Sequence, residues 1–135
     1  MLEVKIFTLY PDLFPGPLDI GIFKKAKENK IWNLKVINIR DYSKDNHGTV
    51  DDTPFGGGSG MLLRPDILAS ALDNNIKKGE KIIYLSPRGK KFDQNVARSL
   101  SKEKNVNFIC GHFEGVDQRL LETRNIEEYL SLIHI

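Results

Sequence analysis

Two short stretches carry the residue types that could perform chemistry. Residues 108–119 read FICGHFEGVDQR, so an apolar run ends at Gly111 and the carboxylate of Glu114 follows it. Residues 81–85 form a second apolar run, which leads into Ser-Pro-Arg-Gly at positions 86–89. Ligands of α/β proteins collect in the crevice outside the carboxyl ends of the strands, where glycine lets the backbone approach closely. We therefore expect one pocket that is lined by two strand-end loops.

A glycine cluster lies in the long segment between residues 40 and 60. Four of the five residues at 56–60 are glycine. Such a loop can direct backbone N–H groups at a phosphate. It does not match a P-loop, because no Lys-Ser or Lys-Thr follows, and no strand leads into it as in dinucleotide-binding folds. A phosphate cradle and a surface loop both remain open on this pattern.

Three carboxylates stand next to these glycine-rich stretches. Asp51 and Asp52 could bind a metal or accept hydrogen bonds from a base, but the rest of a metal-ligand set is missing, which favours a solvated loop. Glu114 could accept hydrogen bonds from a nucleobase edge or be an acidic residue at a helix N-terminus. His47 and His112 lack the spacing of metal ligands. We predict no metal site.

The composition describes an ordinary globular protein. The 135 residues are 40% hydrophobic and 28% charged, with a net charge of +2, which permits a nucleic-acid partner without requiring one. Cys110 is the only cysteine, so no internal disulfide can form. No apolar run approaches the roughly 18 residues of a membrane span, and the N-terminus does not resemble a signal peptide. We expect a cytoplasmic protein with no membrane association.

The apolar periodicity predicts strands that alternate with helices. The predicted strands cover residues 2–9, 31–39, 81–85 and 106–110, and the predicted helices cover residues 19–30, 64–78, 93–104 and 115–124. Asp19 is the expected N-cap of the first helix, and Gly79 is expected to end the second. Pro15-Gly16-Pro17 is too proline-rich for a helix. Residues 126–135 are ambiguous. This alternation indicates an α/β fold with a mostly parallel sheet flanked by helices on both faces.

Several segments together resemble one protein family. In order and spacing they are similar to the N-terminal domain of bacterial tRNA (guanine-N1-)-methyltransferases, which belong to the SPOUT class of knotted methyltransferases. The similarity covers residues 1 to about 128. The segments are FTLYP at 7–11, NIRDY at 38–42, TVDD at 49–52, PFGGGSGM at 54–61, YLSPRG at 84–89 and CGHFEGVDQR at 110–119.

The resemblance implies a cofactor, a substrate and residues for each. S-adenosylmethionine would be the methyl donor, and a tRNA anticodon stem-loop bound across a homodimer would be the substrate. Glu114 would contact the target guanine, and Asp51 would read a neighbouring base. One wall of the cofactor pocket would consist of Tyr84, Leu85, Ser86, Pro87 and Gly89, and the other of Gly111 and Gly115.

The sequence also departs from the family pattern. Asn46 and Gly48 stand where the family usually carries basic residues, which should weaken phosphate contacts. After Glu128 the chain reads YLSLIHI, whereas the family continues into the loop that threads the knot. The family's general base, an aspartate, and its C-terminal tRNA-binding domain lie further along. We therefore expect residues 1–135 to form a single truncated domain with an incomplete knot, no assignable catalytic residue and little or no turnover.

Three alternatives remain open at this point. The chain could be a non-catalytic module that binds ligand or dimerises. It could be a decayed gene remnant, whose exposed apolar surface would favour aggregation. A metal-dependent hydrolase that uses Asp51 and Asp52 is the third, and the missing ligand set counts against it.

Overall fold

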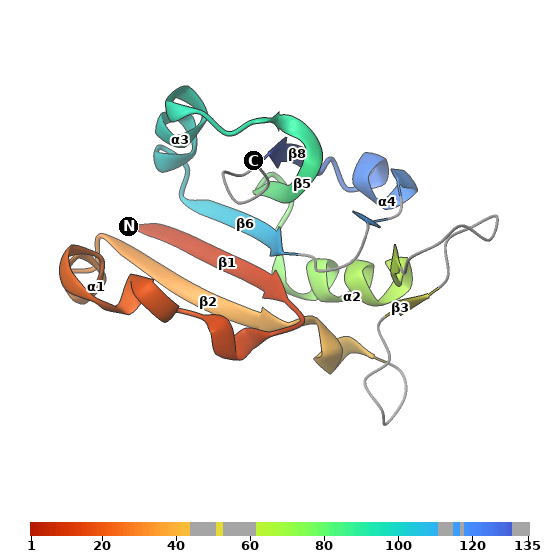
Figure 1. The fold of residues 1–135 in the computed structure, drawn as a ribbon, viewed down its shortest axis with the longest axis horizontal. Helices are drawn as coiled ribbons and strands as arrows, with labels where there is room; N and C mark the ends of the chain where they lie inside the picture. Colours follow the sequence, from red (N-terminus) through yellow and green to blue (C-terminus); the bar gives the residue numbers. More distant parts are fainter. Residues whose placement is uncertain (44–50, 53–61, 111–114, 117, 131–135) are drawn as a thin grey trace.

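The computed structural model describes residues 1–43, 51–52, 62–110, 115–116 and 118–130. Within them the fold is α/β, as predicted (Figure 1). The main sheet is five-stranded and wholly parallel, with strand order β2-β1-β6-β5-β8. Its strands are β1 (Leu2–Thr8), β2 (Trp32–Asn38), β5 (Lys81–Lys91), β6 (Asn105–Cys110) and β8 (Glu127–Leu130).

A small second sheet and seven helical segments complete the described chain. The second sheet has the order β3-β4-β7, with β3 (Asp51–Asp52), β4 (Leu62–Leu63) and β7 (Gly115–Val116). The α-helices are α1 (Gly21–Glu28), α2 (Pro65–Asn75), α3 (Gln94–Ser101) and α4 (Gln118–Thr123), and the 3-10 helices are η1 (Pro11–Leu13), η2 (Gly16–Asp19) and η3 (Ile39–Tyr42).

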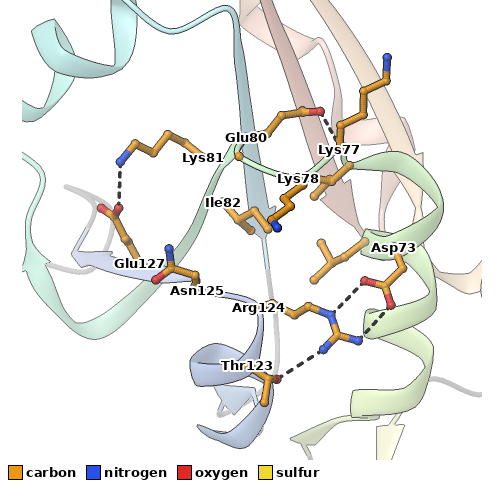
Figure 2. A pocket seen from close by; sticks show the side chains of 13 residues that line it. Asp73, Lys77, Lys78, Glu80, Lys81, Ile82, Thr123, Arg124, Asn125 and Glu127 are labelled. Carbon is orange, nitrogen blue, oxygen red and sulfur yellow. Dashed lines mark hydrogen bonds and ion pairs between the residues drawn. The ribbon is translucent and has the colours of Figure 1, made fainter.

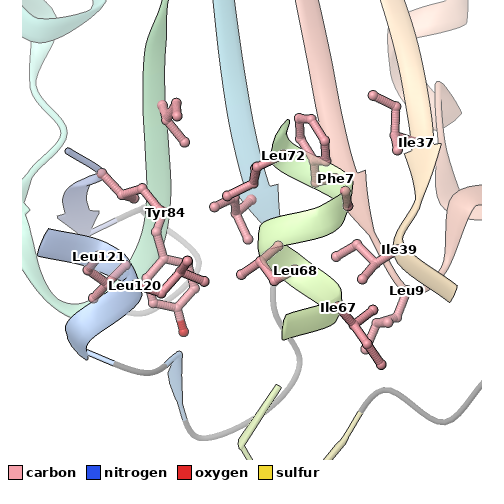
Figure 3. Packing of buried hydrophobic residues seen from close by; sticks show 14 residues of the cluster. Phe7, Leu9, Ile37, Ile39, Ile67, Leu68, Leu72, Tyr84, Leu120 and Leu121 are labelled. Carbon is pink, nitrogen blue, oxygen red and sulfur yellow. The ribbon is translucent and has the colours of Figure 1, made fainter. Parts of the chain in front are cut away.

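The hydrophobic core lies between one face of the main sheet and the helices α2 and α4 (Figure 3). Phe7 on β1 is in register with Ile37 on β2 and Ile109 on β6, so their side chains form one row on that face. Helix α2 covers this row with Ile67, Leu68, Ala71 and Leu72, and α4 adds Leu120 and Leu121. Side chains alternate along a strand, so Ile6 and Ile83 belong to the opposite face, and both are buried. Both faces of the sheet are therefore covered.

The N-terminal helical region differs from the prediction. Asp19 does not cap α1: it lies in η2, and Ile20 is the N-cap residue without a side-chain hydrogen bond. The segment at 15–17 contributes to η2, because proline fits the first turn of a 3-10 helix. Helix α2 ends at Asn75, and its capping residue Ile76 is already extended. Gly79 has a φ of +94° but lies in the following loop.

The C-terminal half differs more. Strand β5 continues to Lys91, six residues beyond the predicted end at Leu85. Gly115 and Val116 were expected in a helix, but they form β7 and pair with β4, so α4 begins only at Gln118. The ambiguous C-terminal segment contains β8, which pairs parallel to β5. The expectation of an incomplete knot depends on residues 111–114 and 131–135, which lie outside the described residues, as does most of the loop at 40–60.

Helix α3 has a side-chain N-cap, Asp93, which the sequence analysis counted as the first residue of the helix. The Asp93 side chain accepts a hydrogen bond from the backbone N–H of Val96 at 3.0 Å, which satisfies one of the free donors at the helix start. Asp93→Ala is expected to lower the free energy of unfolding by about 1 kcal/mol, as measured by urea denaturation. Asp93→Asn is the matched control and should be nearly neutral. Equal stability of the alanine variant and the wild type would show that this cap contributes nothing.

Candidate functional site

The point after Leu85 in β5 and the end of β6 at Cys110 lie on neighbouring parallel strands of the main sheet, as the sequence predicted. These two strands are parallel and adjacent, and Tyr84 is in register with Ile109. Tyr84 and Ser86 are only 3% and 2% exposed. β6 ends at Cys110, and Gly111 and Glu114 follow it outside the described residues. The structure thus places the β5 half of the predicted pocket at the carboxyl edge of the strands.

The first predicted loop is a bulge within a longer strand. Leu85 and Lys90 both oppose Tyr129 of β8, so residues 86–89 leave the regular ladder. Pro87 has no backbone N–H to donate to a ladder, which explains why the pairing breaks there. We call residues 86–89 the β5 bulge. The prediction of a loop that follows the strand was wrong, because the strand resumes after Gly89.

Contacts with β8 hold the β5 bulge in place. The Ser86 hydroxyl donates a 2.6 Å hydrogen bond to Oε2 of Glu128, and it accepts one of 3.2 Å from the backbone N–H of Arg88. Gly89 lies so close to β8 that an added Cβ would stand 2.5 Å from the backbone N and C of Tyr129. The absence of a side chain at Gly89 therefore serves strand packing, and a role of this glycine toward a cofactor stays a prediction.

Burial shifts the pKa of two titratable side chains at this edge, Tyr84 and Cys110. Burial raises the pKa of the Tyr84 phenol, the Glu128 carboxylate adds to the rise, and the nearby Arg88 charge opposes it. Tyr84 is therefore neutral at pH 7, and its hydroxyl can donate a hydrogen bond. Burial also raises the pKa of the half-buried Cys110 thiol. A thiol of raised pKa is a poor nucleophile, in agreement with a structural role.

A pocket of about 390 Å³ opens beside the β5 bulge. Its charged lining consists of Arg88 and Lys90 from β5, Glu122 from α4 and Glu128 from β8. Leu121 and Ile126 add apolar surface. A concave site of mixed apolar and charged character suits a small ligand that carries both kinds of group. We call it the bulge pocket.

A larger pocket, of about 640 Å³, lies near the start of β5 and the ends of α2 and α4 (Figure 2). Its charges are mostly paired with one another: Arg124 forms two hydrogen bonds with Asp73, at 2.9 and 3.0 Å, and Lys81 lies 3.4 Å from Glu127. It stands at the amino end of β5, whereas ligands of parallel α/β sheets bind at the carboxyl ends. We therefore assign the functional site to the bulge pocket in spite of its smaller volume.

The small second sheet brings two other predicted site residues together. β4 pairs with β3, which contains Asp51, and also with β7, which contains Gly115. The sequence pattern of such short strands does not indicate that they share one sheet. Pro87 belongs to the β5 bulge, and Gly111 and Glu114 lie outside the described residues.

Sequence reasoning missed Glu128. It is 42 residues from Ser86 in the sequence and reaches the bulge only because β8 pairs with β5. No spacing rule connects the two positions.

Among the described residues no cluster of histidine, cysteine and acidic side chains could hold a metal ion. None of the helices in the described part of the chain is long and apolar enough to span a membrane.

The parallel sheet with helices on both faces defines an α/β domain, and comparison with known proteins gives its family. The pattern of the family described as tRNA (Guanine-1)-methyltransferase TrmD matches residues 2–133. The chain belongs to this family, which confirms the resemblance seen in the sequence.

Curated relatives agree with the family match. The tRNA (guanine-N(1)-)-methyltransferase of Pelagibacter ubique is 67% identical over 128 residues, which cover 95% of this chain and 56% of the relative. The enzyme of the same name from Wolbachia pipientis subsp. Culex pipiens is 48% identical over 122 residues, or 89% of this chain and 53% of the relative. The enzyme of the same name from Ehrlichia canis is 43% identical over 129 residues, which cover 94% of this chain and 55% of the relative. The chain thus spans about half the length of the curated relatives it matches.

Proposed function

We propose that the chain supplies the S-adenosylmethionine site of a tRNA (guanine-N1-)-methyltransferase. The methyl group would pass to N1 of a guanine beside the anticodon of tRNA. The observation that carries this proposal is the family match over residues 2–133, joined to a pocket that Arg88 and Gly89 of the family-like segment at 84–89 help to line. The match to named methyltransferases supports the reaction class.

The residues at the carboxyl edge of the sheet fit such a cofactor. S-adenosylmethionine presents an adenosine, a carboxylate, and cationic ammonium and sulfonium groups. Leu121 and Ile126 offer apolar surface in the bulge pocket, and the carboxylate of Glu128 suits a cationic ligand. When bound, the cofactor supplies a methyl group that is activated by its sulfonium charge. We propose that one wall consists of Tyr84, Leu85, Ser86, Pro87 and Gly89, and that Gly111 and Gly115 belong to the other.

The substrate residues and partners are proposals of the same kind. Glu114 would hold the target guanine, and Asp51 would read a neighbouring base of the anticodon stem-loop. Pairing of β3 and β7 with β4 supports this, since the strands of Asp51 and Gly115 flank β4 in one small sheet. We further propose a cytoplasmic homodimer that binds tRNA across both copies.

Proton removal from guanine N1 requires a base. Tyr84, in β5 just before the bulge, is neutral because of its raised pKa, and Glu128 already accepts a hydrogen bond from Ser86. We assign the base to neither residue, and we expect little or no turnover by this chain alone. Methylation of an anticodon stem-loop RNA at the rate of the longer relatives would overturn that expectation.

Photo-crosslinking tests the proposed binding site. The chain is irradiated with methyl-labelled S-adenosylmethionine, digested with trypsin and analysed by mass spectrometry. We expect label in the peptides 82–88 and 105–119, which contain the two strand ends, and loss of the label when unlabelled S-adenosylhomocysteine is added. Peptide 36–40 is the internal control, because it comes mainly from β2, the strand at the far edge of the sheet from β5 and β8. Equal labelling of the control peptide, or label that the competitor does not displace, would contradict the proposal.

A further inference from the structure

Glu128 has one carboxylate oxygen to spare for a ligand. Its Oε2 accepts the 2.6 Å hydrogen bond from Ser86, and its Oε1 has no partner among the described residues. The side chain lines the bulge pocket and is half-buried. A carboxylate in this position keeps its charge directed at the pocket while Ser86 fixes its orientation.

Glu128 also differs from the other charges of the bulge pocket in its burial. Arg88, Lys90 and Glu122 are exposed, whereas Glu128 is half-buried. Water and salt screen exposed charges strongly and partly buried charges much less. Glu128 therefore acts on a ligand in the pocket with less screening than the other three charges. Burial and then the Glu128 charge raise the pKa of the nearby Tyr84.

We propose that Glu128 determines ligand specificity at the bulge pocket, because its carboxylate favours the cationic methyl donor over the neutral product. This inference rests on the proposed function. In the transfer, the bond between sulfur and methyl carbon breaks and a bond between guanine N1 and that carbon forms. The sulfur keeps the electron pair of the broken bond and becomes an uncharged thioether, while the N1 proton leaves to a base. The donor therefore carries one more positive charge than the product, and the Glu128 carboxylate favours the donor by its attraction to that charge.

Calorimetric titrations of S-adenosylmethionine and S-adenosylhomocysteine test this proposal. Glu128→Gln removes the charge but can still accept the hydrogen bond from Ser86. We expect the ratio of donor affinity to product affinity in this variant to fall about fivefold to tenfold, because the attraction between opposite charges in a partly screened site is lost. The affinity for the product should not change. Lys90→Gln removes an exposed positive charge from the same pocket and should raise the preference about twofold.

The outcomes separate the inference from the proposed function. If the wild type binds neither ligand, the proposed function fails and the inference fails with it. If both ligands bind and Glu128→Gln leaves their ratio unchanged, or weakens both equally, Glu128 has only a structural role and the inference alone is overturned. Should Glu128→Gln lose its cooperative thermal transition, the wild type decides the matter, since equal affinity of the wild-type chain for the donor and the product contradicts the proposal.

Discussion

Gly89→Ala is expected to lower the free energy of unfolding by about 3 kcal/mol and to abolish binding of S-adenosylmethionine. The new Cβ would stand 2.5 Å from the backbone N and C of Tyr129 and 2.6 Å from its Cα. Backbone atoms cannot rotate aside as a flexible side chain can, so β8 has to move away from β5. That movement would break the Ser86–Glu128 hydrogen bond, which fixes the β5 bulge.

The same displacement would disturb the other contacts between the two strands. Phe92 and Tyr129 form an edge-to-face pair with ring centroids 5.8 Å apart, and the Phe92 N–H donates to the Leu130 carbonyl at 3.1 Å. Urea denaturation and calorimetric titration measure the two effects. Lys90→Ala, at the adjacent exposed position, is the matched control and should change stability by no more than about 0.5 kcal/mol. A stable Gly89→Ala variant that binds the cofactor normally would contradict this account of the bulge.

Glu80→Ala should lower the free energy of unfolding by about 2 kcal/mol, since it removes the acceptor at the centre of a buried polar cluster. The Glu80 side chain is 10% exposed and lies 3.6 Å from Nζ of Lys5. It accepts hydrogen bonds from the backbone N–H of Lys77 at 2.8 Å (Figure 2) and from Nδ2 of Asn107 at 3.2 Å. Without Glu80 the Lys5 charge loses its counter-ion. Arg64→Ala, which breaks an exposed ion pair, is the control and should have little effect.

The same cluster predicts a pH dependence. Burial alone would raise the pKa of Glu80, but hydrogen bonds from Lys77 and Asn107 and the charge of Lys5 outweigh it and hold the pKa below 4.5. A carboxylate of lowered pKa stabilises the fold above its unfolded value and loses that contribution as pH falls through the folded value. We expect wild-type stability to fall below about pH 4.5, and Glu80→Gln to show a shallower decline in acid denaturation. If the free energy of unfolding falls with pH in the same way in the wild type and in Glu80→Gln, Glu80 is not the cause of the acid sensitivity.

The apolar periodicity predicted the strands of the sheet and the helices that cover it, since burial on both faces leaves a strong pattern in the sequence. The extension of β5 could not be predicted, because Pro87 and Gly89 are typical of a loop. Only the packing of Tyr129 against Gly89 shows that the strand resumes. Strand β8 was ambiguous for a similar reason: its four residues are half-buried, so their apolar pattern is weak.

The candidate site could be predicted in part. The sequence predicted that Leu85 and Cys110 end segments on neighbouring parallel strands, and the β5–β6 pairing confirms the neighbourhood, although β5 itself continues to Lys91. The hydrogen bond of Ser86 with Glu128 and the sheet that joins Asp51 to Gly115 could not be predicted, because both depend on pairing between distant short strands. The roles of Glu114 and Gly111 stay predictions, since neither residue lies within the described part of the chain.

Calorimetric titration of the wild-type chain with S-adenosylmethionine tests the central claim most directly. The account predicts one site per chain with a dissociation constant on the order of micromolar, corresponding to about −8 kcal/mol, and loss of that site in Gly89→Ala. A sample that unfolds cooperatively on heating and yet shows no heat of binding would contradict the account. The wall formed by the β5 bulge would then be insufficient for cofactor binding.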